Sequence, residues 1–558
     1  MKKFLLILII PAFFFLLKPG IYWNMHDDMQ IIRQLEMEKC LQDGQIPCRW
    51  APDLGYGYGY PLFNFYPPMP YFVGQVFRTA GFSFVTTVKL TAATQIILSA
   101  LGMYLLASLL FGPIGGTISA LFYTYAPYHA VNIYVRGAMN EAWAAVFFPF
   151  ILYFAKKLID TGKPLYLLFL ALSFSGLMLS HNPMVLVFTP VLLAWCLFWL
   201  ITKFHQNIKN SFPTVIKLTL SGSLAFGLSA FYTLPVLFES KLVQIESMFI
   251  NYYHFSIHFV SFYQLFFSNY WGDGPSVWGT EDQMSFAIGY LQWLVPLLII
   301  IYLLIKFIRF RKINQIELAT IFIFSAGLFS AFMSHERSTF IWLILSPVQK
   351  IQFPWRFLNL TTFLMSFAAG FLPLIFRQKQ WLSLIIIIPL LVINLAYFNP
   401  IHQGPITDQQ KLSGLAWRNQ ITSGIYDYLP KTARIAPLKA ATDYVDEVIP
   451  PTVKYQLSGQ QKGTDWQFYN LTLDKPATVY LSQLGFPNFV VKDNGQSIPY
   501  LIEPELGRIS LNLDAGTHQI YLKLHNTPIR TIANSLSLLS IVLLGLALIF
   551  PRLWKKLI

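Results

Sequence analysis

Charged residues are scarce in this chain of 558 residues: only 12% are Asp, Glu, Lys or Arg, against about 25% in a soluble domain. Acidic residues are rarer than basic ones, 26 against 40, which gives a formal net charge of +14. Hydrophobic residues make up 55% of the chain. This composition excludes an ordinary soluble protein and predicts a chain that mostly faces lipid or other helices.

Motifs that bind nucleotides or build a serine hydrolase are absent. The chain has no G-x-x-x-x-G-K-[ST], no G-x-S-x-G, and no G-x-G-x-x-G in a strand–helix context. ATP-driven transport and serine hydrolysis therefore lose support. The basic residues lie in short clusters between apolar runs instead of one patch, so no nucleic-acid partner is expected.

Cysteine is also rare, with three residues in the whole chain. Cys196 falls inside an apolar run, whereas Cys40 and Cys48 share the first polar loop. No second Cys or His pair accompanies these two, so their spacing does not predict a zinc site. A disulfide is chemically allowed if the loop is extracytoplasmic, and two free thiols are equally consistent with the sequence.

Apolar stretches of about 20 residues predict about twelve membrane spans. The lipid bilayer is therefore one predicted partner of the chain. We place them at residues 4–23, 86–110, 113–131, 139–156, 164–181, 183–202, 218–236, 285–306, 316–333, 354–376, 380–398 and 531–553. The connecting segments on one side are short and basic, as at Lys156-Lys157 and at 306–312. The positive-inside rule then predicts cytoplasmic N- and C-termini in a bacterial inner membrane, with an uncleaved first helix.

Three regions follow from these spans. Residues 1–398 form a transmembrane domain with a large first extracytoplasmic loop at 24–85, and residues 531–558 form a C-terminal anchor. Between them, residues 399–530 gain charge, turn residues and alternating patterns such as 478–481 and 518–524. This middle region predicts an extracytoplasmic all-β sandwich. The fold class is thus an α-helical polytopic membrane protein with a C-terminal β-domain.

Two adjacent acids, Asp27 and Asp28, come directly after the first predicted span. Carboxylates beside a membrane are costly and suggest a functional site. Two neighbouring acids raise one pKa, which suits a general base, and they also suit a bound cation. The alternative is that both are solvated and cap the helix of the following loop.

Other candidates lie in the remaining extracytoplasmic loops, and each also has a structural interpretation. Arg136 could hold a phosphate, Glu141 could share a cavity with Asp28 or match a helix dipole, and His181 is more often structural in such a position. Arg356 could bind a lipid phosphate or extend to the interface. The remaining candidates for substrate binding are Tyr58 and Tyr60 in a Gly-rich loop, Trp355, His335 and Glu336.

The chain resembles the GT-C superfamily of integral membrane glycosyltransferases, through its acidic pair after the first span, its large first loop and its many spans. The segments 55–68, 136–141, 180–183 and 352–357 are similar to a bacterial family labelled "6-pyruvoyl-tetrahydropterin synthase-related membrane protein". The segments 485–495 and 515–520 are similar to the β-domain of the YfhO-like branch of bacterial GT-C proteins.

This resemblance implies a glycosyltransferase that uses a polyprenyl-phosphate sugar as donor and an extracytoplasmic lipid, glycan or protein as acceptor. It implies that Asp27 or Asp28 is the catalytic base, with Asp28 slightly preferred. Glu141 would assist acceptor or metal binding, and Arg356 would hold the donor phosphate. A divalent cation, Mg²⁺ or Mn²⁺, remains open as a cofactor, although the second loop lacks an Asp-x-Asp. A non-catalytic flippase or cell-envelope assembly protein is the alternative, and a sugar-binding β-domain held by inert spans is a weaker one.

Overall fold

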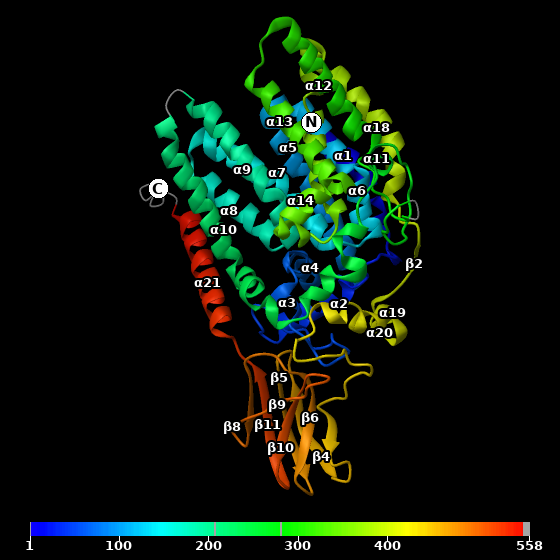
Figure 1. Cartoon of the computed structure of the whole chain (residues 1–558), viewed down its shortest axis with the longest axis vertical. Helices are drawn as coiled ribbons and strands as arrows, with labels where there is room; N and C mark the ends of the chain where they lie inside the picture. The colour runs from blue at the N-terminus through cyan, green and yellow to red at the C-terminus, as the bar shows by residue number, and fades with distance from the viewer. Residues whose placement is uncertain (1, 206–207, 280–281, 551–558) are drawn as a thin grey trace.

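The computed structural model describes residues 2–205, 208–279 and 282–550, and Figure 1 shows helices in the larger part with strands gathered at one end. Two predictions lie outside the described residues: the cytoplasmic location of the basic C-terminus at 552–556, and the end of the last predicted span. The order of elements follows the predicted division: helices first, then strands, then one long helix, α21 (Pro528–Ile549).

The helices begin and end as follows. The first half contains α1 (Lys2–Phe13), α2 (Gln30–Gln42), α3 (Leu62–Phe65), α4 (Met69–Thr79), α5 (Phe84–Thr124), α6 (Pro127–Ala130), α7 (Met139–Thr161), α8 (Pro164–Met178), α9 (Asn182–Phe204) and α10 (Phe212–Glu239). The second half contains α11 (Phe262–Phe266), α12 (Tyr290–Phe310), α13 (Gln315–Ser334), α14 (Thr339–Ile344), α15 (Ser346–Gln349), α16 (Phe357–Ala369), α17 (Leu372–Ile375), α18 (Ile387–Asn394), α19 (Asp408–Lys411) and α20 (Gly414–Thr422).

Within the described residues, nine helices are long and apolar enough to cross a membrane. They are Phe84–Thr124, Met139–Thr161, Asn182–Phe204, Phe212–Leu242, Tyr290–Phe310, Gln315–Ser334, Pro354–Ile375, Gln378–Phe398 and Pro528–Ile549. Two further predicted spans are shorter apolar helices, Lys3–Leu17 and Pro164–Met178. The prediction of a helical polytopic protein is confirmed, and the count is lower than about twelve because those two helices are short and two predicted spans share α5.

The 41-residue helix α5 is two helices that fold back on each other. Gly112 interrupts it with φ 74° and ψ 175°, a conformation that favours glycine. A Cβ atom placed on Gly116 would lie 2.8 Å from the carbonyl oxygen of Tyr104. In a straight helix these two residues would be about 18 Å apart. The chain therefore reverses at Gly112, as the separate predictions of 86–110 and 113–131 require.

The first predicted span, residues 4–23, is too long at its end. The helical conformation stops at Leu17, and Pro19 and Gly20 separate it from strand β1 (Ile21–Trp23). Strand β1 pairs antiparallel with β2 (Gln403–Pro405), which lies just after the last predicted span of the transmembrane domain. The predicted helix ends early because residues 21–23 pair with a distant strand, which the local sequence does not reveal.

Two antiparallel sheets form the C-terminal domain and confirm its prediction as a β-domain. One sheet has the order β3-β6-β10-β9 and the other β4-β5-β11-β7-β8. The strands are β3 (Val445–Ile449), β4 (Tyr455–Lys462), β5 (Trp466–Leu473), β6 (Ala477–Leu484), β7 (Phe489–Asp493), β8 (Gln496–Ile498), β9 (Leu501–Ile502), β10 (Arg508–Leu513) and β11 (Gly516–Leu524). Buried residues of both sheets, among them Val479 and Leu471, share one core, as in a sandwich.

The first loop joins the β-domain to the helices. The Tyr58 carbonyl accepts a hydrogen bond from the Leu484 amide at 3.1 Å, and Trp50 packs edge-on against Phe489. Cys40 and Cys48 form a disulfide in this loop. Helix α21 leaves the β-domain and runs beside α10 (Figure 1). The loop between α12 and α13 lies at the opposite end from the strands (Figure 1).

Candidate functional site

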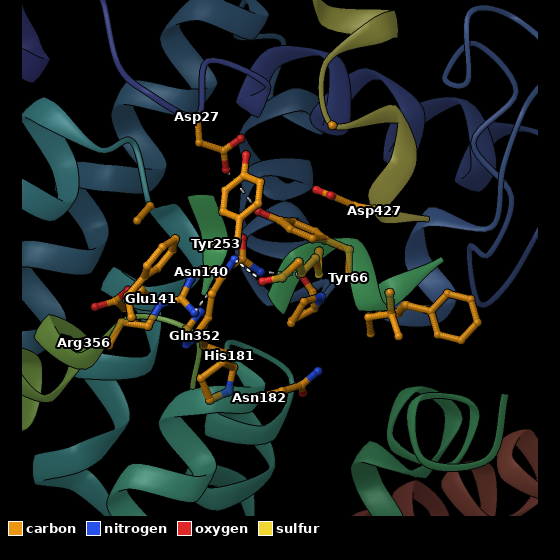
Figure 2. A pocket seen from close by; sticks show the side chains of 18 of the residues that line it. Asp27, Tyr66, Asn140, Glu141, His181, Asn182, Tyr253, Gln352, Arg356 and Asp427 are labelled. Carbon is orange, nitrogen blue, oxygen red and sulfur yellow. Dashed lines mark hydrogen bonds and ion pairs between the residues drawn. The ribbon is translucent and has the colours of Figure 1, made fainter. Parts of the chain in front are cut away.

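A cavity of about 1150 Å³ lies where the loops of the helical part meet the segment before the β-domain. Its wall is drawn from the first and second loops, the start of α9, the end of α10, residues 245–253, residues 273–276 with Met284, residues 347–356 and residues 423–428. Figure 2 shows the labelled polar side chains converging on this space. The volume exceeds the roughly 300–1,000 Å³ of most small-molecule sites.

Asp27 lines the cavity and is held by the helix that follows it. Its Oδ2 accepts a hydrogen bond from Arg33 Nη1 at 2.6 Å and another from Gln30 Nε2 at 3.2 Å. The Arg33 guanidinium also lies over the ring of Tyr66, 4.2 Å from its centroid. Among the described residues, none donates a hydrogen bond to Asp27 Oδ1, so this oxygen is available to a substrate.

Backbone hydrogen bonds tie the loop of Asp27 to the second loop. The Asp27 amide donates to the Arg136 carbonyl at 2.9 Å, and the His26 amide donates to the Val135 carbonyl at 3.0 Å. Gly137 has φ 63°, and a Cβ there would lie 2.3 Å from Met25 Sδ. Only glycine fits this close approach. The glycine in the 136–141 segment therefore serves to join the two loops.

Asp28 points elsewhere. Its carboxylate pairs with Lys411 of α19, and it is not among the residues that line the cavity. Burial raises its pKa, and the nearby Lys411 opposes that rise. The structure thus separates the acidic pair: Asp27 faces the cavity, and Asp28 anchors the segment that precedes the β-domain.

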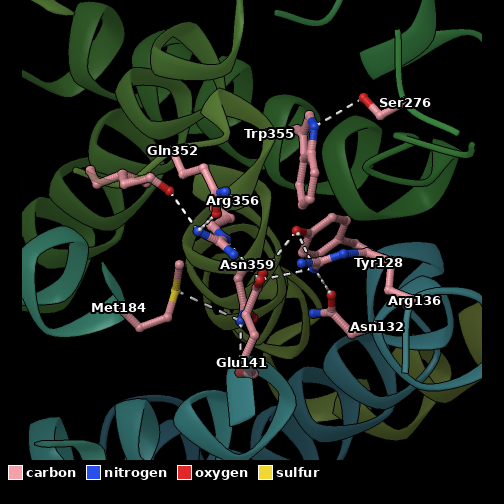
Figure 3. Close-up of polar contacts among 11 residues, drawn as sticks. Tyr128, Asn132, Arg136, Glu141, Met184, Ser276, Gln352, Trp355, Arg356 and Asn359 are labelled. Carbon is pink, nitrogen blue, oxygen red and sulfur yellow. Dashed lines mark hydrogen bonds and ion pairs between the residues drawn. The ribbon is translucent and has the colours of Figure 1, made fainter. Parts of the chain in front are cut away.

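Glu141 links two arginines at the other side of the cavity, as Figure 3 shows. Its Oε2 is 2.9 Å from Arg136 Nη1 and 3.4 Å from Arg356 Nε, and its side chain is 1% exposed. Its Oε1 accepts from the Tyr128 hydroxyl at 2.9 Å. Two buried positive charges share one negative charge here, so the group carries a surplus of about one positive charge.

Other contacts orient the two arginines and leave part of each free. Arg356 Nη1 donates to the Gln352 amide oxygen at 3.1 Å and to the Ile351 carbonyl at 2.7 Å. Arg136 lies over the ring of Trp355 at 4.3 Å. Neither Nη2 atom donates a hydrogen bond to any residue that the structure describes, although both side chains line the cavity. We call Arg136, Glu141 and Arg356 the arginine end.

His181 lies near the arginine end on the cavity wall. Burial lowers the pKa of His181 well below its usual value, and the charges of Arg356 and Arg136 lower it further. The imidazole is therefore neutral, and its buried Nδ1 has no hydrogen-bond partner in the described part of the chain. The next residue, Asn182, donates to the Tyr232 hydroxyl at 2.7 Å.

The other predicted residues fall in three places. Tyr60 and Trp355 line the cavity, whereas Tyr58 packs at the junction with the β-domain. His335 and Glu336 line a separate groove of about 490 Å³ between α11 and α13. The structure therefore brings Asp27, Arg136, Glu141, His181 and Arg356 to one cavity and leaves His335 and Glu336 outside it.

Several residues of the site were not predicted. Arg33 and Tyr66 surround Asp27, and Asp427 enters the cavity from the 3₁₀ helix η12 (Ile425–Asp427). The sequence could have indicated Arg33, because it is the basic residue nearest to Asp27 along the chain and lies on a polar helix. Asp427 carries no local signal, because it lies 400 residues from Asp27. We call Asp27, Arg33 and Asp427 the acid end.

At the acid end, a divalent cation would have to be held by Asp27 Oδ1 and Asp427, because Asp27 Oδ2 is paired with Arg33. Arg33 Nη1 already occupies the position 2.6 Å from Asp27 Oδ2 that a cation would take. Within residues 2–205, 208–279 and 282–550, no group of three or more His, Cys, Asp and Glu side chains could hold a metal ion. The reaction proposed for this cavity uses no cation.

The fold and the cavity define a class: a helical polytopic membrane protein with a β-sandwich, and with a charged cavity between them. No family model matches the chain. It is 24% identical over 214 residues to an uncharacterized protein of Lactococcus lactis subsp. cremoris (strain MG1363), a match that covers 38% of this chain and 34% of that protein.

Among solved structures, the chain is similar to the oligosaccharyltransferase of Archaeoglobus fulgidus in its apo form. The identity is 12% and the TM-score 0.44, over 72% of this chain and 56% of that one. The chain spans about a third to a half of the length of these two proteins. The activity of the chain is therefore proposed from the site itself.

Proposed function

We propose that this protein is a membrane glycosyltransferase that moves a sugar from a polyprenyl-phosphate donor to an extracytoplasmic hydroxyl. The observation that carries the proposal is that one cavity holds two partly free arginines at one end and a carboxylate with a free oxygen at the other. A sugar phosphate needs cations for its leaving group, and its acceptor needs a base.

The arginine end suits the donor phosphate. Guanidinium groups bind phosphate oxygens through paired N–H donors, and Glu141 holds both arginines while cancelling only part of their charge. Negative charge that develops on the phosphate in the transition state would meet fixed donors in a site shielded from water. His181, being neutral, adds no competing charge.

The lipid part of a donor would enter from the membrane side of the cavity. Leu186 of α9 and Leu237 of α10 belong to its wall, and they are 46% and 62% exposed. Both helices are candidate membrane spans. An apolar opening beside a cationic end matches a ligand with a long hydrocarbon chain and a phosphate head.

The acid end suits the acceptor. The acceptor hydroxyl would give its proton to Asp27 while its oxygen forms a bond to the anomeric carbon of the donor sugar. The bond from that carbon to the phosphate oxygen would break, and the electron pair would leave with the phosphate toward Arg136 and Arg356. Attack opposite to the leaving group inverts the anomeric configuration. Arg33 fixes the Asp27 carboxylate in place.

Paired substitutions of the two neighbouring acids test this proposal. Asp27→Asn should reduce sugar transfer by about 10²–10⁴-fold, the usual contribution of a general base. Asp28→Asn should keep transfer by the folded protein close to the native rate, since its side chain contacts Lys411 and not the cavity. Transfer is measured in nanodiscs with radiolabelled polyprenyl-phosphate hexoses, and folding by thermal unfolding of each variant.

Native activity in Asp27→Asn would remove the base assignment. Absence of transfer and of donor hydrolysis in the unmodified protein, with every donor tried, would instead favour a non-catalytic flippase or assembly protein. In that case the two acids would be dispensable for binding the lipid-linked donor.

A further inference from the structure

The segment before the β-domain is fastened to the helical part at three points. Strand β2 pairs with β1, and the Asp408 carboxylate accepts from the amides of Phe84 and Val85 at 2.7 and 2.9 Å. Lys411 pairs with Asp28. Residues 403–428 are therefore a fixed part of the cavity wall and not a free linker.

This segment delivers Asp427 and Tyr428 to the acid end. Tyr428 stacks on Phe65, with ring centroids 6.5 Å apart and planes at 4°, and on Tyr60 at 6.2 Å and 24°. Both tyrosines are buried. The stack fixes the backbone beside Asp427, so its side chain enters the cavity from a rigid position.

Asp27 and Asp427 face one space. Figure 2 shows both carboxylates directed into the part of the cavity that Tyr66 and Tyr253 border. The charge of Arg33 lowers the pKa of Asp427 and the charge of Asp27 raises it, and all three side chains line the same cavity. The Ser247 hydroxyl lies within hydrogen-bonding reach of Asp427, and no nitrogen of the described residues donates to this carboxylate, whereas Asp27 uses one oxygen for Arg33.

Two carboxylates with free oxygens beside aromatic rings match the chemistry of a sugar. Ionised carboxylates only accept hydrogen bonds, and a sugar ring offers several hydroxyl donors close together. Aromatic rings such as those of Tyr66 and Tyr253 present flat apolar faces with a polar tip, which suit the faces of such a ring. A simple alcohol would use one carboxylate and leave the other without a partner.

We propose that Asp427 binds a second hydroxyl of a sugar acceptor whose reacting hydroxyl is held by Asp27, so that the acceptor is a glycan or a glycolipid. This inference rests on the proposed glycosyl transfer. It makes the end of the segment 403–428 a part of the transfer site, with the three contacts to the helical part holding that segment in place.

The test compares Asp427→Asn with Asp443→Asn, a matched change at a side chain that is 84% exposed on the β-domain. The full-length protein is placed in phospholipid nanodiscs, because glycoside detergents would act as acceptors. Donors are short-chain polyprenyl-phosphate glucose, mannose, galactose and N-acetylglucosamine. Acceptors are octyl β-glucoside, which has neighbouring hydroxyls, and 1-octanol, which has one.

Asp427→Asn should raise the KM for octyl glucoside about 10- to 100-fold, the loss of a hydrogen bond to a charged group. It should change the KM for 1-octanol and the hydrolysis of the donor by water far less than the KM for octyl glucoside, and Asp443→Asn should change none of the three. An equal loss with both acceptors, or an unchanged KM for octyl glucoside, would overturn the inference while leaving glycosyl transfer intact. No transfer or hydrolysis by the unmodified protein with any donor would overturn the proposed function, and this inference with it.

Discussion

The arginine end and the acid end of the cavity differ in charge, in exposure and in the part of the chain that completes each of them. Arg136 and Glu141 lie five residues apart, and Arg356 opens a helix whose start is shaped by Gln352 and Trp355. The acid end combines Asp27 and Arg33 from the first loop with Asp427 from beyond the transmembrane domain. Each end therefore joins a local pair to a distant residue, but Arg356 belongs to the helical part, whereas Asp427 comes from the segment beyond it.

The difference matters for the chemistry. The arginine end is a closed network in which Glu141 is 1% exposed and contacts both arginines. The acid end is more open, since the Asp27 side chain is 35% exposed. A leaving group benefits from fixed, buried charge, whereas an acceptor has to enter and leave. The two ends fit the two substrates of a transferase for this reason.

The largest effect on folding should come from Glu141→Gln. This change leaves two buried arginines close together without a counter-charge, and breaking a buried ion pair costs about 3–5 kcal/mol. Chemical unfolding measured by tryptophan fluorescence should show this loss. Glu336→Gln changes an exposed glutamate outside the cavity and should cost less than about 0.5 kcal/mol. Equal stability of the two variants would show that the arginine end is not a tight network.

Arg356→Gln separates phosphate binding from folding. It removes one cation from the leaving-group side, and we expect transfer to fall about 10²-fold, as when one transition-state donor is lost. Lys350→Gln is the control, because Lys350 lines the same cavity without an ion pair among the described residues. Loss of transfer in both variants to the same extent would mean that the overall charge, and not the position of Arg356, decides activity.

Lys411→Met tests the structural role assigned to Asp28. The half-buried Asp28 carboxylate would lose its partner, which costs about 1–3 kcal/mol. Transfer by the protein that remains folded should stay native, because the pair lies outside the cavity. Lys439→Met, at a side chain that is 68% exposed, should have little effect on either property. A large loss of transfer in Lys411→Met with unchanged stability would contradict this structural role and would favour Asp28 as a residue of the transfer site.

The smallest effect concerns pH. Burial raises the pKa of Asp427 to about 6, and Asp27 adds to the rise while Arg33 opposes it. Tyr60, Tyr253 and Tyr428 also face this group, and they stay neutral below pH 10 because burial raises their pKa values. The folded protein therefore binds the Asp427 proton more tightly than the unfolded chain, and the resulting stability is present below about pH 4 and lost as pH rises through 6.

Asp427→Asn imitates the protonated form at every pH. It should be as stable as the native protein near pH 4 and more stable by about 1–2 kcal/mol at pH 8. Unfolding midpoints at several pH values give this comparison, with Asp443→Asn as the control. A constant difference between native protein and Asp427→Asn across the pH range would contradict the assignment.

Sequence patterns predicted the elements whose structure depends on neighbours along the chain. Strands β6 and β11 contain the alternating segments 478–481 and 518–524, and the reversal at Gly112 separates two spans that were predicted apart. The predicted helix through residue 23 was wrong because β2, almost 400 residues away, takes Ile21–Trp23 as a strand partner.

The sequence by itself determined a polytopic helical protein with a β-domain, because hydrophobic length and alternation are local properties of a chain. It also singled out Arg136, Glu141 and Arg356, whose charges stand out in apolar surroundings. Only the tertiary structure decided that Asp27 and not Asp28 faces the cavity, and that Asp427 joins it. Asp27 and Asp28 lie in the turn before α2, and the direction of each side chain depends on contacts such as Lys411 that come from distant segments.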